Sequence, residues 1–177
     1  MAKFLHRNLG PPPASANDVD NGARYFLERS GSVRGRNIVN QTEFDDVLSE
    51  FSFEKVRRPE ISVQEQNQKF GQAGIVLGAF GTDMVTMFQL HPGTDLIVLC
   101  IEEMRRETND LSGRGIDSAD AYIEQICAII GVRLRRVYST LVRRGPGYSY
   151  LQDMRVDCSA LRQLLSDIIK RRAANSL

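Results

Sequence analysis

SVQEQNQKFGQAGIVLGAFGTDMVTMFQLHPGTDLIVLCIE, residues 62–102, is the stretch that decides the fold. Ser62 followed by Glu65 forms a capping box, which predicts a helix because two backbone N–H groups of its first turn become satisfied. The run from Gly74 to Gly81 is apolar, contains β-branched residues and ends in small residues. A short continuous apolar run bounded by glycines is typical of a strand buried on both faces, as in a parallel sheet.

The turn after this strand is the first candidate site. Gly78 and Gly81 allow the chain to turn tightly, and Thr82 or Asp83 can cap a following helix. In an open α/β sheet, ligands bind at such strand-to-helix turns. The apolar run 95–101 then predicts a second fully buried strand.

Strands and helices alternate through the rest of the chain. We expect strands at 24–29, 53–57, 74–81, 95–101 and 132–142, and helices beginning near Thr42, Ser62, Asp83, Asp117 and in the segment that contains Leu161. This alternation predicts an α/β fold, a Rossmann-like parallel sheet with helices on both faces. Residues 1–23, rich in proline, are expected to form an extended arm or linker, and residues 24–177 the domain. We expect Tyr122 to face the core and the run 170–172 to be solvated.

Composition excludes several classes of function. A formal net charge of +1 on 177 residues gives no general attraction to nucleic acid or to an anionic membrane. No run approaches the roughly 20 apolar residues that a membrane-spanning helix needs. Two histidines make a zinc site improbable, so no metal is expected. The three cysteines lack metal or redox spacing and predict reduced core thiols in a cytoplasmic protein.

Arginines follow the first predicted strand. Arg29, Arg34 and Arg36 lie in a loop of small residues that a parallel sheet would place at the same edge as Gly78–Asp83. Guanidinium groups there suit a pyrophosphate because they stay charged and bind two oxygens at once. The alternative is that these arginines only solubilise a loop, and that the G-x-x-G spacing is only a tight turn.

Three blocks of sequence carry a resemblance to a known family. They are FLERSGSVRGRNIVNQTEF at 26–44, ISVQEQNQKFGQAGIVLGAFGTDMVTMFQLHPGT at 61–94, and DMRVDCSALRQLLSDI at 153–168. In this order they resemble the C-terminal half of glycosyltransferase family 61. The resemblance implies the nucleotide-sugar-binding half of a GT-B enzyme, which contributes to polysaccharide or glycan synthesis. Its partners would be a nucleotide-sugar as co-substrate, with no other cofactor, and a glycan acceptor.

The resemblance also implies site residues. Arg29, Arg36 and Asn40 fall on the family's Arg, Arg and Asn, Glu65 and Gln66 on its E-Q pair, and Gly78, Gly81, Pro92 and Gly93 on its turns. The expected nucleotide-sugar-binding residues are Arg29, Arg36, Asn40, Gly78, Phe80, Gly81, Thr82 and Asp83. The chain departs from the family where Phe80 replaces a His, Thr82 an Ala, Thr86 an Asn and Val98 a Glu. No residue stands out as the catalytic base.

These departures leave three hypotheses open. The first is a sugar transferase that is divergent or works with a separately encoded N-terminal half, because only the arm precedes the first strand. The second is a catalytically inactive relic that acts at most as a nucleotide-binding or interaction module. The third is a fragment of a longer protein, in which apolar residues such as Phe80 and Met84 drive self-association.

Overall fold

A computed structural model describes residues 22–28, 37–102, 116–142 and 153–175. In chain order, the described elements are β1 (Ala23–Leu27), α3 (Gln41–Glu50), β2 (Glu54–Val56), η1 (Arg58–Glu60), α4 (Val63–Gly71), β3 (Ala73–Ala79), η2 (Thr82–Gln89), β4 (Asp95–Ile101), α6 (Ile116–Ile130), β5 (Arg133–Val142), β6 (Asp153–Arg155) and α7 (Cys158–Asn175). The six described strands form one sheet in the order β2-β1-β3-β4-β5-β6. Every pairing is parallel except that of β5 with β6. The expected α/β fold with a mainly parallel sheet is therefore confirmed.

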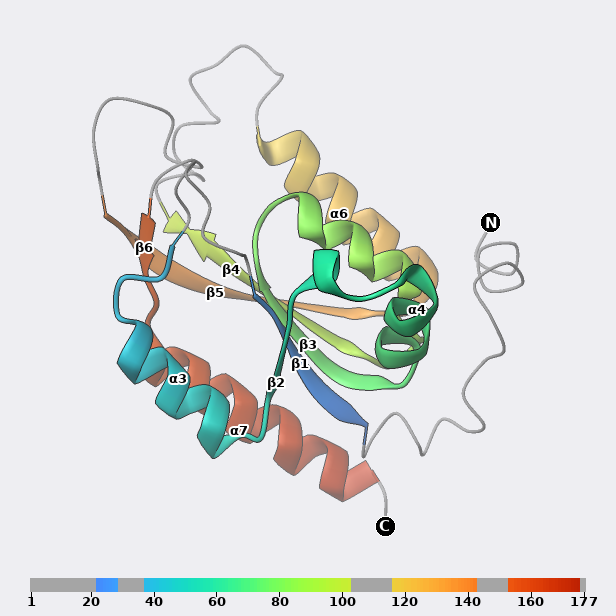
Figure 1. Cartoon of the computed structure of the whole chain (residues 1–177), viewed down its shortest axis with the longest axis horizontal. Helices are drawn as coiled ribbons and strands as arrows, with labels where there is room; N and C mark the ends of the chain where they lie inside the picture. The colour runs from blue at the N-terminus through green and yellow to red at the C-terminus, as the bar shows by residue number, and fades with distance from the viewer. Residues whose placement is uncertain (1–21, 29–36, 103–115, 143–152, 176–177) are drawn as a thin grey trace.

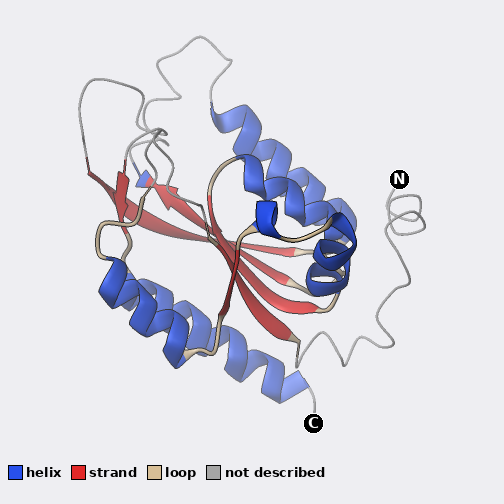
Figure 2. Ribbon diagram, viewed as in Figure 1, coloured by secondary structure: helices blue, strands red, loops and turns tan. Residues whose placement is uncertain are grey.

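The molecule has three layers (Figure 1). Helices α3 and α7 lie against one face of the twisted sheet, and α4, η2 and α6 lie against the other (Figure 2). Two apolar clusters explain this arrangement. Because successive side chains of a strand point to opposite faces, Ile97 and Leu99 of β4 join Phe44 and Leu161 in one cluster, and its neighbours Leu96 and Val98 join the other.

The order of the strands places a topological switch point between β1 and β3. The chain passes from β1 outward to β2, then returns across β1 to form β3 and continues to β4 and β5. The order 2-1-3-4-5 is that of a doubly wound sheet, in which connections diverge to opposite faces at the switch and leave a crevice at the carboxyl ends of the strands. A ligand is therefore expected at the carboxyl ends of β1 and β3, next to Leu27 and Ala79.

Hydrogen bonds join the segment that precedes α3 to strand β6. The backbone N–H of Val39 donates to the carbonyl of Met154, and the N–H of Met154 donates to the carbonyl of Asn37, each at 2.9 Å. Asn37 also donates its backbone and side-chain N–H groups to Asp153, at 2.9 and 3.0 Å. Residues that are more than a hundred positions apart are therefore held together where α3 begins.

Several local expectations differ from the structure. Strand β4 has the expected bounds, Asp95–Ile101, but the helix after β3 is a 3-10 helix whose N-cap is Gly81 rather than Thr82 or Asp83. Strand β6 was not predicted, because three residues carry no readable periodicity. The expectation that Tyr122 faces the core is wrong: it is 57% exposed, since Ile123 and Ile126 already supply the inward face of α6.

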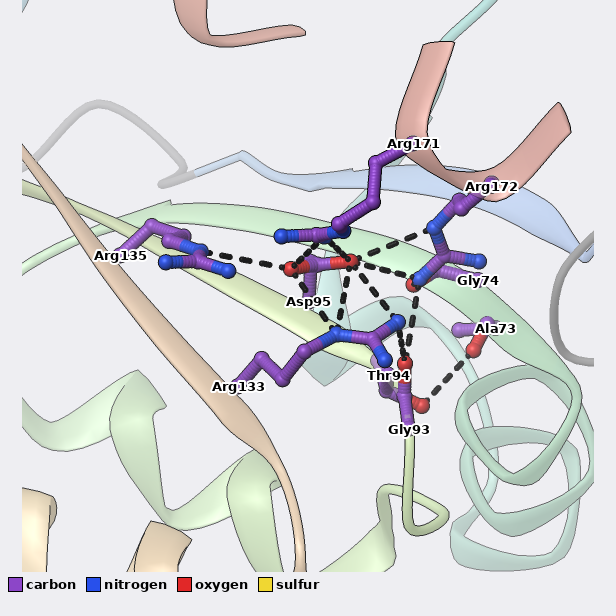
Figure 3. A network of polar contacts seen from close by, with 9 residues as sticks. All are labelled: Ala73, Gly74, Gly93, Thr94, Asp95, Arg133, Arg135, Arg171 and Arg172. Carbon is purple, nitrogen blue, oxygen red and sulfur yellow. Dashed lines mark hydrogen bonds and ion pairs between the residues drawn. The ribbon is translucent and has the colours of Figure 1, made fainter. Parts of the chain in front are cut away.

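The expected solvated run 170–172 is wrong at Arg172. This residue is 5% exposed and donates to Asp95, which is fully buried, from Nη2 at 2.8 Å. Its Nη2 also donates to the carbonyl of Gly74 at 2.7 Å (Figure 3). A buried guanidinium needs such partners because an uncompensated charge is costly in the interior. Arg172 therefore fixes the C-terminal part of α7 to the amino ends of β3 and β4.

Candidate functional site

A pocket lies at the switch point. Its floor comes from Phe26 and Leu27 of β1 and Ala79 of β3, and its other lining residues are Glu28, Asn37, Ile38 and Gln41. Leu27 pairs in parallel with Gly78, so both strands end at this edge. The pocket therefore lies in the crevice where doubly wound sheets bind their ligands. Its floor is apolar, and polar side chains lie around it.

Arg57 and Glu28 join the ends of β1 and β2 beside the pocket. The backbone N–H of Glu28 donates to the carbonyl of Val56 at 2.9 Å. The Glu28 carboxylate accepts from Nε of Arg57 at 2.5 Å, and Arg57 also donates to Glu60 at 3.3 Å. Hydrogen bonds from Arg57 to Glu28 and Glu60 raise the pKa of its guanidinium. The guanidinium group of Arg57 thus lies at the carboxyl edge of the sheet, where β1 ends.

The family's E-Q pair, Glu65 and Gln66, is structural here. Glu65 accepts from the backbone N–H of Ser62 at 2.8 Å, and Ser62 Oγ accepts from the N–H of Glu65 at 3.2 Å. The predicted capping box is therefore confirmed, and its hydrogen bonds from Ser62 lower the pKa of Glu65. Gln66 is buried and donates to the carbonyls of Arg58 and Ile61, at 3.1 and 3.2 Å. Together they fix the turn between β2 and α4.

Asn40 lies at the N-cap of α3, and its side-chain amide connects this helix with the start of α7. Its Nδ2 donates to Glu43 and to the carbonyl of Val156, each at 3.0 Å, and its Oδ1 accepts from the N–H of Val156 at 3.0 Å. Both ends of the amide are therefore engaged within the protein. Asn40 positions the N-terminal end of α3, whose first residue Gln41 lines the pocket.

The predicted residues after β3 are brought to the same edge as the pocket. Gly78 lies in β3, and Phe80 follows it, with its backbone N–H donating to the carbonyl of Leu99 at 3.0 Å. Phe80 is partly buried and contacts both apolar clusters, so its ring covers the rim of the sheet. Gly81 has a φ of +153°, in a region that only glycine readily adopts. Thr82 and Asp83 are the first two residues of η2.

Two of the departures from the family pattern have visible consequences. Val98, where the family has a Glu, is 2% exposed in the apolar cluster beneath α6. Thr86, where the family has an Asn, is fully buried in η2, and its Oγ1 has no hydrogen-bond partner among the described residues. An unsatisfied buried hydroxyl is unusual in a folded protein. At two positions where the resemblance implies polar groups, the chain thus has a buried valine and a threonine hydroxyl without a partner among the described residues.

Arg29, Arg34 and Arg36 lie outside the described residues. The two residues that flank this segment, Glu28 and Asn37, both line the pocket. The expectation that its arginines share an edge with Gly81 stays a prediction.

Sequence reasoning missed Glu28, Asn37 and Gln41 as pocket residues. Glu28 could have been found, because it directly follows a strand that ends at the ligand edge. Asn37 and Gln41 could not have been found, because their position depends on the pairing of Ile38 with β6. No pattern in the sequence predicts that strand.

Within the described ranges, no group of three or more His, Cys, Asp or Glu side chains is arranged to hold a metal ion. Nor does that part of the chain contain a helix long and apolar enough to cross a membrane. The three cysteines are buried, as expected. Burial raises the pKa of both Cys127 and Cys158 to about 11, so these thiols stay protonated at neutral pH.

The strand order and the pocket define a doubly wound α/β domain with a pocket at its switch point. In domains of this class, nucleotides and other ligands bind at the switch point. Within this class, the family model Glycosyltransferase 61 matches residues 2–97, more than half of the 177 residues. The chain belongs to glycosyltransferase family 61. The matched range contains β1, β3 and every residue that lines the pocket. No curated protein sequence gives a match to this chain.

Proposed function

We propose that this domain binds the nucleotide-sugar donor of a glycosyltransferase at the carboxyl edge of its sheet, in the pocket between β1 and β3. The observation that carries the proposal is the position of this pocket at the switch point, within the residues that match the family. Such a domain corresponds to one half of a GT-B enzyme, in which a second half covers the cleft and contacts the glycan acceptor. The product would be a polysaccharide or another glycan.

The diphosphate of the donor is assigned to the loop after β1. In our proposal Arg29 and Arg36 pair with its oxygens, because guanidinium groups bind phosphates bidentately and stay charged. Backbone N–H groups of Gly81, Thr82 and Asp83, at the start of η2, add further donors. The α3 terminus, held by Asn40 and exposing Gln41 to the pocket, offers its positive end to the same charge.

Glycosyl transfer breaks the bond between the sugar's anomeric carbon and the diphosphate, and forms a bond from that carbon to an acceptor oxygen. Negative charge accumulates on the departing diphosphate, so arginines and backbone N–H groups at that position stabilise the transition state. The phenyl ring of Phe80 cannot donate a hydrogen bond or transfer a proton. The proposal therefore gives Phe80 a packing role at the rim and assigns no catalytic base within this chain.

Titration of nucleoside diphosphates into the whole chain tests this proposal. We expect the melting temperature to rise with ligand, because a ligand that binds only the folded state stabilises it by mass action. Arg36→Ala should weaken the affinity by about tenfold or more, the effect of one charge-assisted hydrogen bond. Arg162→Ala is the matched control, because Arg162 of α7 is paired with Glu50 of α3 at 2.9 Å and does not line the pocket.

An unchanged melting temperature of the wild type at millimolar diphosphate would overturn donor binding. Equal affinities of wild type and Arg36→Ala would overturn the assignment of the loop. Sugar transfer that disappears in Arg36→Ala would further exclude the catalytically inactive relic.

A further inference from the structure

The amino edge of the sheet carries a group of four arginines around one carboxylate, which we call the Asp95 cluster. Asp95 begins β4, Arg133 and Arg135 lie at the start of β5, and Arg171 and Arg172 lie near the end of α7 (Figure 3). Seven-residue β4 separates this cluster from the pocket edge by about 20 Å at the usual rise per residue. The cluster is thus a separate feature from the donor pocket.

The arginines of the cluster differ in how deeply they lie. Arg172 has a side chain that is 6% exposed, whereas Arg133, Arg135 and Arg171 are 34%, 35% and 36% exposed. Arg172 is therefore the interior partner of Asp95, and the other three form a rim that is open to solvent. A dissolved ion can reach the rim without any rearrangement of the core.

The single carboxylate is shared among more donors than it can satisfy. Arg171 donates from Nη2 to both oxygens, at 2.9 and 3.0 Å, and Arg133 donates from Nη2 at 3.1 Å. Arg172 contributes Nε and Nη2 at 3.2 and 2.8 Å. Two carboxylate oxygens offer about four lone-pair directions. Arg135 reaches Asp95 only through Nε at 3.5 Å, which leaves it the most weakly bound member.

The charges of the cluster do not balance. Among the described residues of this cluster, four guanidinium groups face one carboxylate, which is an excess of three positive charges within the group, in a chain whose formal net charge is only +1. The effect reaches beyond the cluster: burial and the charge of Arg172 lower the pKa of Arg24. Partly buried charges of one sign attract a counter-ion strongly, because they are screened less than charges on an open surface.

Unused donors of the rim point to the same ligand. Among the described residues, the Nη groups of Arg135 and the Nη1 of Arg171 make no hydrogen bond. Arg135 and Arg171 both donate to Oδ1 of Asp95, at 3.5 and 2.9 Å, so their guanidinium groups lie close to each other (Figure 3). Two neighbouring planar guanidinium groups can donate hydrogen bonds to the oxygens of one tetrahedral oxyanion.

We propose that Arg135 and Arg171, backed by Arg133, bind a phosphate dianion, either free or as the terminal group of a phosphomonoester. A dianion would reduce the excess of three positive charges to one and use the donors that Asp95 leaves unsatisfied. This site is independent of the donor pocket, because it lies on the opposite edge of the sheet. It would sense or hold a phosphorylated small molecule while the pocket edge is free or occupied.

Arginine Nε–Hε NMR spectra of the whole chain locate the binding directly. We expect inorganic phosphate at about pH 8, where the second phosphate proton is lost, to move the resonances of Arg135 and Arg171 to saturation. Chloride at equal ionic strength should not. Arg135→Gln should weaken phosphate binding by about tenfold and still fold, because Arg135 makes the longest contact with Asp95. Arg162→Gln is the matched control, a partly exposed arginine that should leave the affinity unchanged.

A second titration with glucose 1-phosphate distinguishes the two sources of the phosphate. Tighter binding of the ester identifies a phosphorylated metabolite as the ligand, and equal or weaker binding identifies the free ion. The variant Arg36→Ala separates this test from the donor proposal, since it should leave the responses of Arg135 and Arg171 unchanged. Resonances of Arg135 and Arg171 that respond to neither phosphate, or an unchanged affinity in Arg135→Gln, would overturn the proposal.

Discussion

Asp95 is the residue on which the amino edge of the sheet depends. Burial alone would raise its pKa, but hydrogen bonds from Arg172 and Arg133 and their positive charges outweigh this effect and lower it. The carboxylate is therefore ionised in the folded protein, and it neutralises part of a strongly positive group. Removing its charge should be costly, since the arginines would remain in place without the carboxylate that they share.

The variant Asp95→Asn keeps the shape of the side chain and removes its charge. We expect a loss of about 3–5 kcal/mol in the free energy of unfolding, because the buried guanidinium of Arg172 would lose the charged carboxylate that accepts from its Nε and Nη2. Urea denaturation measures this loss. Asp45→Asn is the control, because Asp45 forms an exposed pair with Lys55 and should cost less than about 1 kcal/mol. Equal stabilities of the two variants would contradict the role of Asp95.

The stability of the protein should fall in acid because of Asp95. Its pKa is lower in the folded state than in the unfolded chain, so the unfolded state binds the proton more readily. The contribution is fully present above about pH 4, the unfolded value, and is lost as the pH falls through the folded value. Melting curves between about pH 3 and pH 7 should therefore show a steeper acid loss for the wild type than for Asp95→Asn. Parallel losses would count against this assignment.

The thiols of Cys127 and Cys158 should react very slowly in the folded protein. Burial raises the pKa of each to about 11, so at pH 8 only about one thiol in a thousand is ionised, and the thiolate is the reactive form. Labelling with a thiol reagent, followed by mass spectrometry, should show protection until denaturant is added. Rapid labelling of either residue in native buffer would contradict its burial.

At the scale of elements, local sequence signals predicted most of the sheet and its helices. The bounds of β4 and the capping box of α4 followed from an apolar run and from two residues at the right spacing. The 3-10 form of η2 did not follow, because the apolar spacing of 82–89 is also compatible with an α-helix. Strand β6 exists through its pairing with β5 and with Ile38, which are long-range contacts.

Helix α4 offers a direct test of a local signal. Ser62→Ala removes the hydroxyl that accepts from the N–H of Glu65, and should cost about 1 kcal/mol in the free energy of unfolding. Chemical denaturation measures it, with Ser49→Ala as control, since Ser49 is an exposed residue inside α3. A loss in Ser62→Ala no larger than in the control would show that the capping box contributes nothing.

At the scale of the whole molecule, the sheet has two edges of different character. The carboxyl edge holds the pocket at the switch point, and its general location could be predicted, because a parallel α/β sheet places ligands there. The amino edge could not be predicted. Asp95 opens an otherwise apolar strand, and a buried charge there demands a partner. The identity of that partner, Arg172, depends on how α7 crosses the sheet, which no spacing in the sequence records.

The two edges should act independently. We expect the double variant Arg36→Ala with Arg135→Gln to lose nucleoside diphosphate binding and phosphate binding by the same factors as the two single variants. Sites more than about 10 Å apart without shared partners usually give additive free energies. Calorimetric titration of both ligands into the four proteins measures this. An interaction between the variants larger than about 0.5 kcal/mol would show that the edges communicate.

The contacts between α3 and α7 also set the order in which the protein can mature. Helix α7 supplies Leu161, Leu165 and Ile168 to the same apolar cluster as Phe44 of α3, although it is synthesised after every other described element. A nascent chain that has not yet reached Cys158 must therefore keep one side of its sheet uncovered. During synthesis that side is a surface for chaperones, and the domain can bury it only after α7 has been made.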